Sequence, residues 1–398
     1  MNKIFISFCS LVVLFFSMEA TPTEAMPSTL VKNAKFQDKY GVISVSNSKP
    51  NSNKTNRNKP PVYEYFITRL NKYGRYLGKK LLTETNKKFR LNDTFYDAHR
   101  VFLEIEQHTG QTEPWRTYAN KARDIYKNEY LVPNNYKVAG WMRFPHGPYL
   151  DWKRNGNSAS KSVLLTLNEA GQTSTPEKTS AVYVDTWYEQ AFSRPIAYSL
   201  MNNMLAEKAG ATRNTERVTL LVNMALGHIE QWTTGVYLDG PGWRFAQAFM
   251  TGLTSSALIE YYDRSVELGN PDSRVPVALK KMADWLWANM WVADVGGTSG
   301  NWNDNGGTGY GAFRYVVPAV DGVGSTAPAP MVSQLIVASY AWLYKHTCDA
   351  TYKAKADLIF SGGVMLVKGL SKGKFYNQQH REVFNYFRWR DKGDQSCR

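Results

Sequence analysis

The sequence has few cysteines and no excess of glycine or proline. Three cysteines among 398 residues exclude a disulfide-rich scaffold as the main body, and 29 glycines and 17 prolines exclude a collagen-like chain. Acidic residues are also outnumbered, with 34 Asp and Glu against 48 Lys and Arg, a formal charge of +14. Hydrophobic residues make up 43% of the chain, enough for a large core. The basic surface favours an anionic partner: an acidic polysaccharide, a nucleic acid or a membrane face.

Long apolar runs are absent apart from one short run at the start. Ile4 to Phe16 is apolar, follows the basic Lys3, and precedes small residues that end at Ala25. This pattern predicts a signal peptide over residues 1–25. No later stretch reaches the ~20 apolar residues of a transmembrane helix, so we expect a secreted or periplasmic protein. Cys348 and Cys397 then remain, either as one disulfide or as two free thiols.

Residues 26–60 have no apolar periodicity over most of their length. Ser46 to Pro61 reads SNSKPNSNKTNRNKPP, a composition that cannot bury enough surface to offset its ordering entropy. We predict a disordered basic linker over 26–60 and one folded domain over 61–398. Residues 1–60 carry eight Lys and Arg and three Asp and Glu, so +9 of the formal charge belongs to that domain.

Beyond residue 62, helical patterns alternate with short turns. One stripe has the spacing of a single helical face, Val218, Leu221, Val222, Ala225, Ile229 and Trp232. Five turns separate such patterns: His108 to Gln111, Asn155 to Asn157, Ala209 to Ala211, Leu268 to Asn270 and His346 to Asp349. Glycine suits the left-handed residue that ends a helix, and a following polar residue can cap the next one. We predict a mainly helical protein of helical hairpins, with strands at Ser180 to Asp185 and Phe313 to Val317.

The turns recur at irregular spacings of 46, 54, 59 and 79 residues. Open solenoids keep a nearly constant repeat, so these spacings favour a closed ring with insertions between hairpins. Together with Phe249-Met250-Thr251-Gly252-Leu253 and Ala257 to Tyr262, this rhythm resembles the (α/α) toroid proteins of the six-hairpin glycosidase-like group. The resemblance covers roughly residues 62–390 and concerns the fold. It implies an (α/α)6-type toroid, but it transfers no catalytic residue, because no family-specific catalytic signature is present.

The loops between hairpins are long and rich in aromatic, basic and acidic residues. Four of them contain Trp141, Trp187, Trp243 and Trp302. In a ring these loops emerge at one end, where toroid proteins of known activity bind glycans. Flat rings stack on sugar faces, and polar side chains bond hydroxyl and carboxylate groups. The alternative is that these rings plug the core of the ring.

Glycoside hydrolysis requires two carboxyl groups, one protonated and one ionised. The candidates are Asp185, Glu189, Asp239 and Asp304. Asp185 and Glu189 are four residues apart, so a helix would place both on one face. The alternatives are a helix-capping Asp beside a surface Glu, and turn-forming Asp239 and Asp304.

Polysaccharide lyase chemistry requires a Tyr or His base and a cation that neutralises the uronic carboxylate. His146, Tyr188, Arg194, Arg244 and the pair His380 and Arg381 are candidates, although His146 also suits a turn. The full set of predicted substrate-binding residues is Trp141, His146, Trp187, Tyr188, Arg194, Trp243, Arg244, Trp302, Asn303, His380 and Arg381. We expect a hydrolase acting on an acidic polysaccharide or oligosaccharide. A lyase and a non-catalytic glycan-binding envelope protein are the alternatives.

Motifs of other enzyme classes are missing from the sequence. There is no Gly-x-x-x-x-Gly-Lys-Ser/Thr loop, Gly-x-Ser-x-Gly turn or His-Glu-x-x-His helix. The Gly-rich run at 296–311 lacks the flanking strand and helix of a dinucleotide site. We therefore predict no cofactor and no metal, and the absence of a nucleic-acid-binding motif argues against that partner.

Overall fold

The protein is mainly helical, as the sequence predicts. The computed structural model describes residues 59–171, 189–233, 246–296, 308–317 and 325–397, apart from the side chains of residues 189–192 and 231, and also the backbone of 35–38 and 41–44. The helices of the first half are α1 (Tyr63–Thr83), α2 (Lys87–Thr94), α3 (Ala98–Thr109), α4 (Trp115–Ile125), α5 (His146–Asn155), α6 (Ser158–Gly171), α8 (Glu189–Lys208) and α9 (Thr215–Thr233). Those of the second half are α10 (Ala248–Glu267), α11 (Arg274–Met290), α12 (Pro330–Ser333), α13 (Val337–Thr347), α14 (Ala350–Leu366), α15 (Gly373–His380) and α16 (Val383–Ser396). Among the described residues, no helix combines the length and the apolar character needed to cross a membrane.

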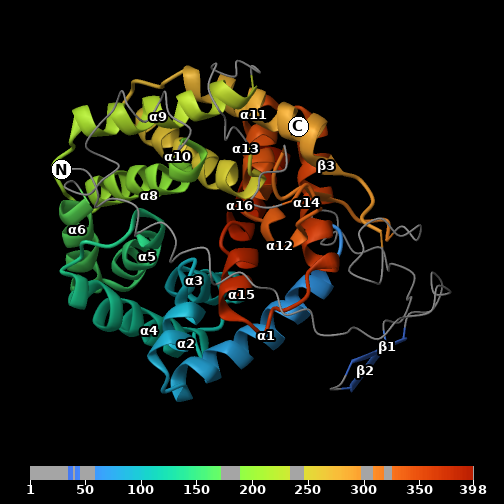
Figure 1. Cartoon of the computed structure of the whole chain (residues 1–398), viewed down its shortest axis with the longest axis horizontal. Helices are drawn as coiled ribbons and strands as arrows, with labels where there is room; N and C mark the ends of the chain where they lie inside the picture. Colours follow the sequence, from blue (N-terminus) through green and yellow to red (C-terminus); the bar gives the residue numbers. More distant parts are fainter. Residues whose placement is uncertain are drawn as a thin grey trace, which may run out of the picture.

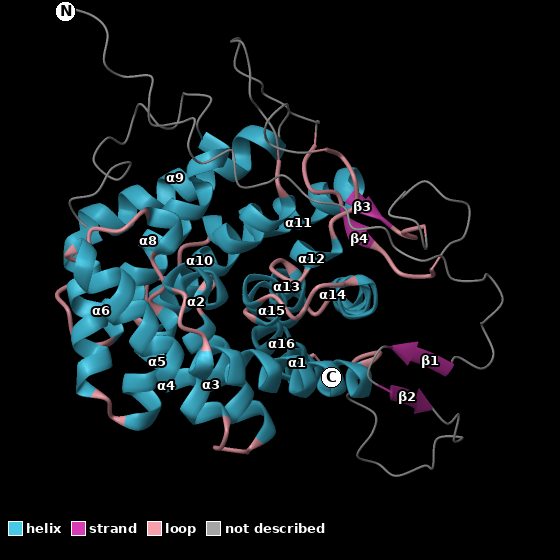
Figure 2. Cartoon of the chain, turned by 60° about the horizontal axis from the view of Figure 1, so that its bottom comes forward, coloured by secondary structure: helices cyan, strands magenta, loops and turns pink. Residues whose placement is uncertain are grey.

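Strands are short. β1 (Lys35–Asp38) pairs antiparallel with β2 (Gly41–Ser44), a hairpin inside the stretch predicted to be a linker. β3 (Trp291–Val292) pairs antiparallel with β4 (Ala312–Phe313), as Figure 2 shows. The predicted strand from Phe313 is only partly formed: β4 ends there, and single bridges follow at Arg314 and Val317. The strand predicted at 180–185 and the signal peptide at 1–25 lie outside the described residues.

All five predicted turns are confirmed. Each connects two consecutive helices: α3 to α4, α5 to α6, α8 to α9, α10 to α11 and α13 to α14. A residue with positive φ stands in each turn: Gly110, Gly156, Gly210, Gly269 and Cys348. The predicted caps are present in two of them, because Asn157 accepts from the backbone N–H of Ser160 at 3.2 Å and Asp349 accepts from that of Thr351 at 2.9 Å.

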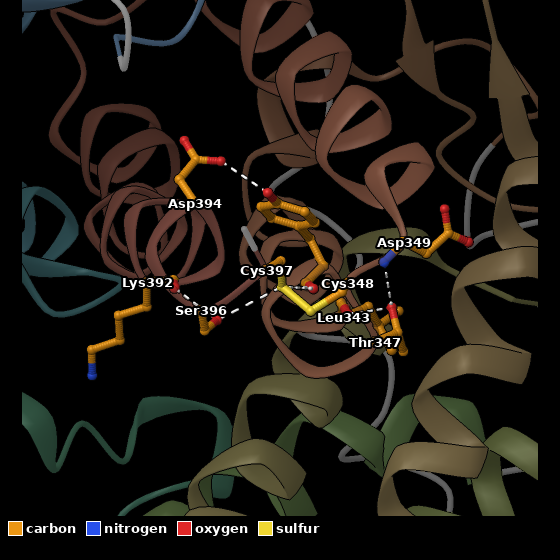
Figure 3. The surroundings of a disulfide bond; sticks show 9 residues. Leu343, Thr347, Cys348, Asp349, Lys392, Asp394, Ser396 and Cys397 are labelled. Atoms are coloured by element: carbon orange, nitrogen blue, oxygen red, sulfur yellow. Dashed lines mark hydrogen bonds between the residues drawn. A yellow bond between two sulfur atoms is a disulfide. The ribbon is translucent and has the colours of Figure 1, made fainter.

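Cys348 takes the position that glycine holds in the other turns. Its φ is +58°, a left-handed conformation that costs a residue with a Cβ more than it costs glycine. Its sulfur is bonded to Cys397 at the end of α16, across a Cα–Cα distance of 5.2 Å (Figure 3). The turn therefore keeps the common geometry, and the disulfide ties the C-terminal helix to it.

The first helices of the hairpins pack against one another in chain order. α3 contacts α5, α5 contacts α8, α8 contacts α10, and α10 contacts α13. α16 packs against α13, and α15 contacts both α16 and α3. The second helices α4, α6, α9 and α11 lie nearer the rim of the view in Figure 1. One large hydrophobic core fills the space between the helices.

α1 docks on this assembly through one face. That face contains Phe66, Leu70, Gly74, Leu77, Gly78 and Leu81, which are buried. The hydroxyl of Tyr376 donates to the carbonyl of Leu70 at 2.8 Å, and a Cβ on Gly74 would stand 2.3 Å from that hydroxyl oxygen. Close contact with Tyr376 thus requires glycine at 74 and fixes which face of α1 is turned outward.

Candidate functional site

Most predicted site residues fall in loops that are not described. The residues outside the described ranges are Asp185, Trp187, Tyr188, Asp239, Trp243, Arg244, Trp302, Asn303 and Asp304. Glu189 begins α8, but its side chain is not described. Among the carboxylates predicted to be catalytic, none therefore has a described side chain. Trp141, His146, Arg194, His380 and Arg381 can be placed, and they divide between two clusters and the core.

The first group, the Trp141 cluster, consists of Phe95, Trp141, Arg194, Tyr315 and Lys374. The guanidinium carbon of Arg194 lies 5.7 Å from the centroid of the Trp141 ring, and that ring lies 5.6 Å from the ring of Phe95. The ammonium of Lys374 is 5.5 Å from the centroid of Phe95. Trp141 is 38% exposed, so part of its ring is open to solvent. The cluster joins residues that precede or begin α3, α5, α8 and α15.

The electrostatics of the Trp141 cluster favour an anion. Burial lowers the pKa of Lys374, and the positive charge of Arg194 lowers it further. The Nε of Arg194 is buried and has no hydrogen-bond acceptor among the described residues. Burial raises the pKa of Tyr315, against the influence of Arg194. Two partly buried cations that repel each other beside flat rings can bind a ligand that carries a negative charge and a flat apolar face.

The second group, the buried charge cluster, consists of Asp97, Arg100, His146, Glu260, Arg381 and Glu382. The guanidinium of Arg100 donates to both carboxylate oxygens of Glu382, at 3.0 and 3.4 Å, and Arg381 donates to the same carboxylate at 3.1 Å. Arg381 also donates to the hydroxyl of Tyr198 at 2.9 Å. Burial by itself raises the pKa of Glu382, but Arg100 and Arg381 lower it to about 2. Glu382 is therefore ionised at neutral pH and engaged with its partners.

His146 and Glu260 form a close pair in the same cluster. The Nε2 of His146, at the start of α5, contacts Oε1 of Glu260 on α10. Burial raises the pKa of Glu260 to about 7, whereas burial and the charges of Arg100 and Arg381 hold the pKa of His146 well below its usual value. The side chain of Glu260 remains 23% exposed. Glu260 is thus a carboxyl group that can hold and release a proton near neutral pH.

Asp97 positions the start of both α3 and α5. One of its carboxylate oxygens accepts from the backbone N–H of Arg100 at 3.1 Å, and the other accepts from that of Gly147 at 3.0 Å. Tyr96 and Asp97 both have left-handed backbones, with φ of +65° and +67°. Such strain persists where surrounding contacts over-determine it. Here the hydrogen bond from Gly147 to Asp97 fixes the backbone next to His146.

The structure reassigns two of the predicted binding residues. His380 is 3% exposed, its Nδ1 lies 2.7 Å from the carbonyl oxygen of Tyr376, and its ring packs on that of Tyr376 at 4.1 Å. Burial lowers its pKa to about 3. We therefore assign His380 to the core rather than to substrate binding. The neighbouring Arg381 points into the buried charge cluster and is fully engaged there, so it too is structural.

The sequence predictions did not include Glu260, Arg100, Glu382 or Lys374. A usable signal existed for Glu260, which lies three residues after Ala257 and seven after Leu253, on an otherwise apolar helical face. Charged residues on such a face are rarely buried without a partner. Lys374 gave no such signal, because a lysine before an aromatic residue is common.

Metal-ion sites and known relatives add no further assignment. The described part of the chain contains no group of three or more His, Cys, Asp or Glu side chains placed to hold a metal ion. No protein-family model matches the chain, and comparison with curated proteins and with solved structures found none that is similar to it.

Proposed function

We propose that this chain is an exported carbohydrate-active protein with an (α/α) toroid fold that binds an anionic polysaccharide. The order of helix packing supports the fold. α3, α5, α8, α10, α13 and α16 contact one another in sequence, and α15 leads back to α3. A ring of hairpins produces this order of contacts, whereas an open stack does not bring its last helices to its first.

The Trp141 cluster is the observation that carries the proposed binding. A uronic acid residue has a flat sugar face and a carboxylate, and the cluster offers a half-exposed indole beside Arg194 and Lys374. Ring stacking and charge neutralisation would therefore act on the same sugar. The basic domain, with a formal charge of +9, would add longer-range attraction.

Hydrolysis is the reaction that we propose, and Asp185, Glu189, Asp239 and Asp304 are the candidate catalytic carboxylates. Glu260 does not suit this role, because its carboxyl group contacts His146 within the buried charge cluster.

Elimination by a lyase is the second candidate, because Arg194 and Lys374 are cations of the type that neutralise a uronic carboxylate. The base would come from Tyr188 or from Tyr315. Burial raises the pKa of Tyr315 and makes it a poor base at neutral pH. Because of the raised pKa of Tyr315, we favour hydrolysis over elimination.

Binding is tested with polygalacturonate as the acidic probe and dextran as the neutral one. Trp141→Ala and Arg194→Gln should each weaken polygalacturonate binding by about tenfold, the loss of one stacking or charge contact. The matched controls are Trp152→Ala and Lys161→Gln, which break a similar cation–ring pair of 4.9 Å between α5 and α6. Equal losses in all four variants would show that the effect is not specific to the Trp141 cluster.

The reaction is tested by following digestion of the same polymer. New reducing ends without the ultraviolet absorbance of an unsaturated product indicate hydrolysis, and both signals together indicate elimination. Asp185→Asn or Asp239→Asn should abolish hydrolysis and preserve binding. Binding without either signal would identify a non-catalytic glycan-binding protein. Export is tested by the N-terminal sequence of the mature protein, which should begin at Met26.

A further inference from the structure

The outward face of α1 and α2 carries a concentration of positive charge. Residues 63–94 contain eight Lys and Arg and three Asp and Glu, a net charge of +5 out of the +9 of the whole domain. Lys72, Arg75, Lys79, Lys87 and Lys88 are all exposed. A charged outer face is ordinary for an amphipathic helix, so charge alone assigns no role to this surface.

These two helices also expose aromatic rings, which a merely solvated surface does not require. Among the described residues, the exposed aromatic side chains are those of Tyr65 (44%), Tyr76 (53%), Phe89 (53%) and Trp141 (38%). Three of these four rings belong to α1 or α2. Trp141 belongs to the cluster described above, so exposed rings occur on the candidate sugar-binding site and on this surface.

Rings and cations alternate along a single row of α1. Tyr65, Lys72, Tyr76 and Lys79 stand at i, i+7, i+11 and i+14, spacings that keep them on one side of a helix. The row is roughly 21 Å long at ~1.5 Å per residue. Arg69 stands beside it, with its guanidinium carbon 5.5 Å from the centroid of Tyr65. The close packing of Gly74 against Tyr376 fixes this row outward, and Figure 1 shows α1 at the edge of the molecule.

We propose that the outward row of α1, Tyr65, Lys72, Tyr76 and Lys79, is a second binding surface for a linear acidic polysaccharide, separate from the Trp141 cluster. The ligand class rests on the proposed function, whereas the surface itself does not. Charge complementarity with a chain of carboxylates supplies attraction, and the exposed rings supply stacking contacts at intervals along that chain. An anionic membrane is the less favoured partner, because a membrane-bound helix presents a continuous apolar face, and here cations interrupt the rings.

The test measures binding of the full chain to polygalacturonate at low ionic strength. Lys72→Glu/Lys79→Glu should weaken binding by about tenfold or more, and added salt should reduce the difference from the unmodified protein. Lys280→Glu/Lys281→Glu is the matched control, because it changes the net charge equally on α11, which carries none of the exposed aromatic rings found among the described residues. Equal weakening by both double variants would overturn the proposal, since net charge alone would then explain the effect.

The contribution of the exposed rings is tested with Tyr65→Ala/Tyr76→Ala. The control is Val277→Ala/Leu358→Ala, a double variant that removes exposed aliphatic side chains. Only the tyrosine variant should weaken binding, by about tenfold, and the loss should add in free energy to that of Arg194→Gln. If only the α1 variants lose binding, the α1 surface is supported and the Trp141 cluster is refuted as a binding site. If only Arg194→Gln loses binding, the Trp141 cluster is supported and the α1 surface is refuted. If the α1 variants reduce binding to phosphatidylglycerol vesicles but not to polygalacturonate, the surface is a membrane contact and the proposal is wrong.

Discussion

The buried charge cluster and the Trp141 cluster both contain charged side chains. The first pairs arginines with carboxylates, whereas the second brings two cations near each other. In the buried charge cluster, Arg100 and Arg381 face the carboxylate of Glu382 and lower its pKa to about 2. In the Trp141 cluster, burial and then the positive charge of Arg194 lower the pKa of a second cation, Lys374. In the buried charge cluster the opposite charges neutralise each other, so we assign these residues to the stability of the fold. Two like charges beside aromatic rings at a partly exposed site form an arrangement that suits an anionic ligand.

The first way to test this comparison is to remove the central carboxylate. Glu382→Gln removes the carboxylate that accepts hydrogen bonds from both Arg100 and Arg381, two buried arginines, which should lower the free energy of unfolding by about 3–5 kcal/mol. Urea unfolding monitored by circular dichroism measures the change. Glu230→Gln is the control, because it breaks the exposed pair with Lys281 and should cost less than about 1 kcal/mol. Similar costs for the two variants would show that the buried cluster is not a structural centre.

The second prediction concerns the pH dependence contributed by Glu260. Its pKa is about 7 in the folded protein, against an ordinary value of 4.5, so the folded state holds this proton more tightly than the unfolded state does. Its stabilising contribution is therefore complete below about pH 4.5 and is lost as the pH rises through about 7.

Glu260→Gln removes this titration and keeps a donor for His146. From pH 5 to pH 8, its free energy of unfolding should rise relative to the unmodified protein by roughly 1–3 kcal/mol. Urea titrations at four pH values measure the difference, and Glu230→Gln should leave the slope unchanged. A constant offset between the Glu260 variant and the unmodified protein at every pH would contradict the raised pKa.

Helix positions and turns could be predicted from the sequence because their causes are local. Apolar spacing and the residues Gly110, Gly156, Gly210 and Gly269 mark where helices run and end, and the structure confirms each turn. Cys348 could not be resolved in this way. Whether it bonds to Cys397 depends on α16 packing against α13, a contact between segments 49 residues apart.

The site could be predicted only in part, because burial and pairing are long-range properties. The sequence predicts that Trp141 and Arg194 each bind substrate, and the structure adds that the guanidinium carbon of Arg194 lies 5.7 Å from the centroid of the Trp141 ring. His380 and Arg381 are adjacent in the sequence, but they point into different surroundings, the core beside Tyr376 and the buried charge cluster. Pairing of His146 with Glu260 joins residues 114 positions apart, which no local pattern reveals.

The smallest expected effect separates the two clusters most sharply. Arg194→Gln removes one cation–ring contact but also relieves repulsion with Lys374, so the free energy of unfolding should change by less than about 1 kcal/mol. The pKa of Lys374 should rise at the same time, because the neighbouring positive charge is gone. Urea unfolding gives the first quantity, and NMR titration of reductively methylated lysines gives the second. If Arg194→Gln instead costs as much as Glu382→Gln and leaves Lys374 unchanged, Arg194 is a structural residue like Arg381, and the contrast between the clusters disappears.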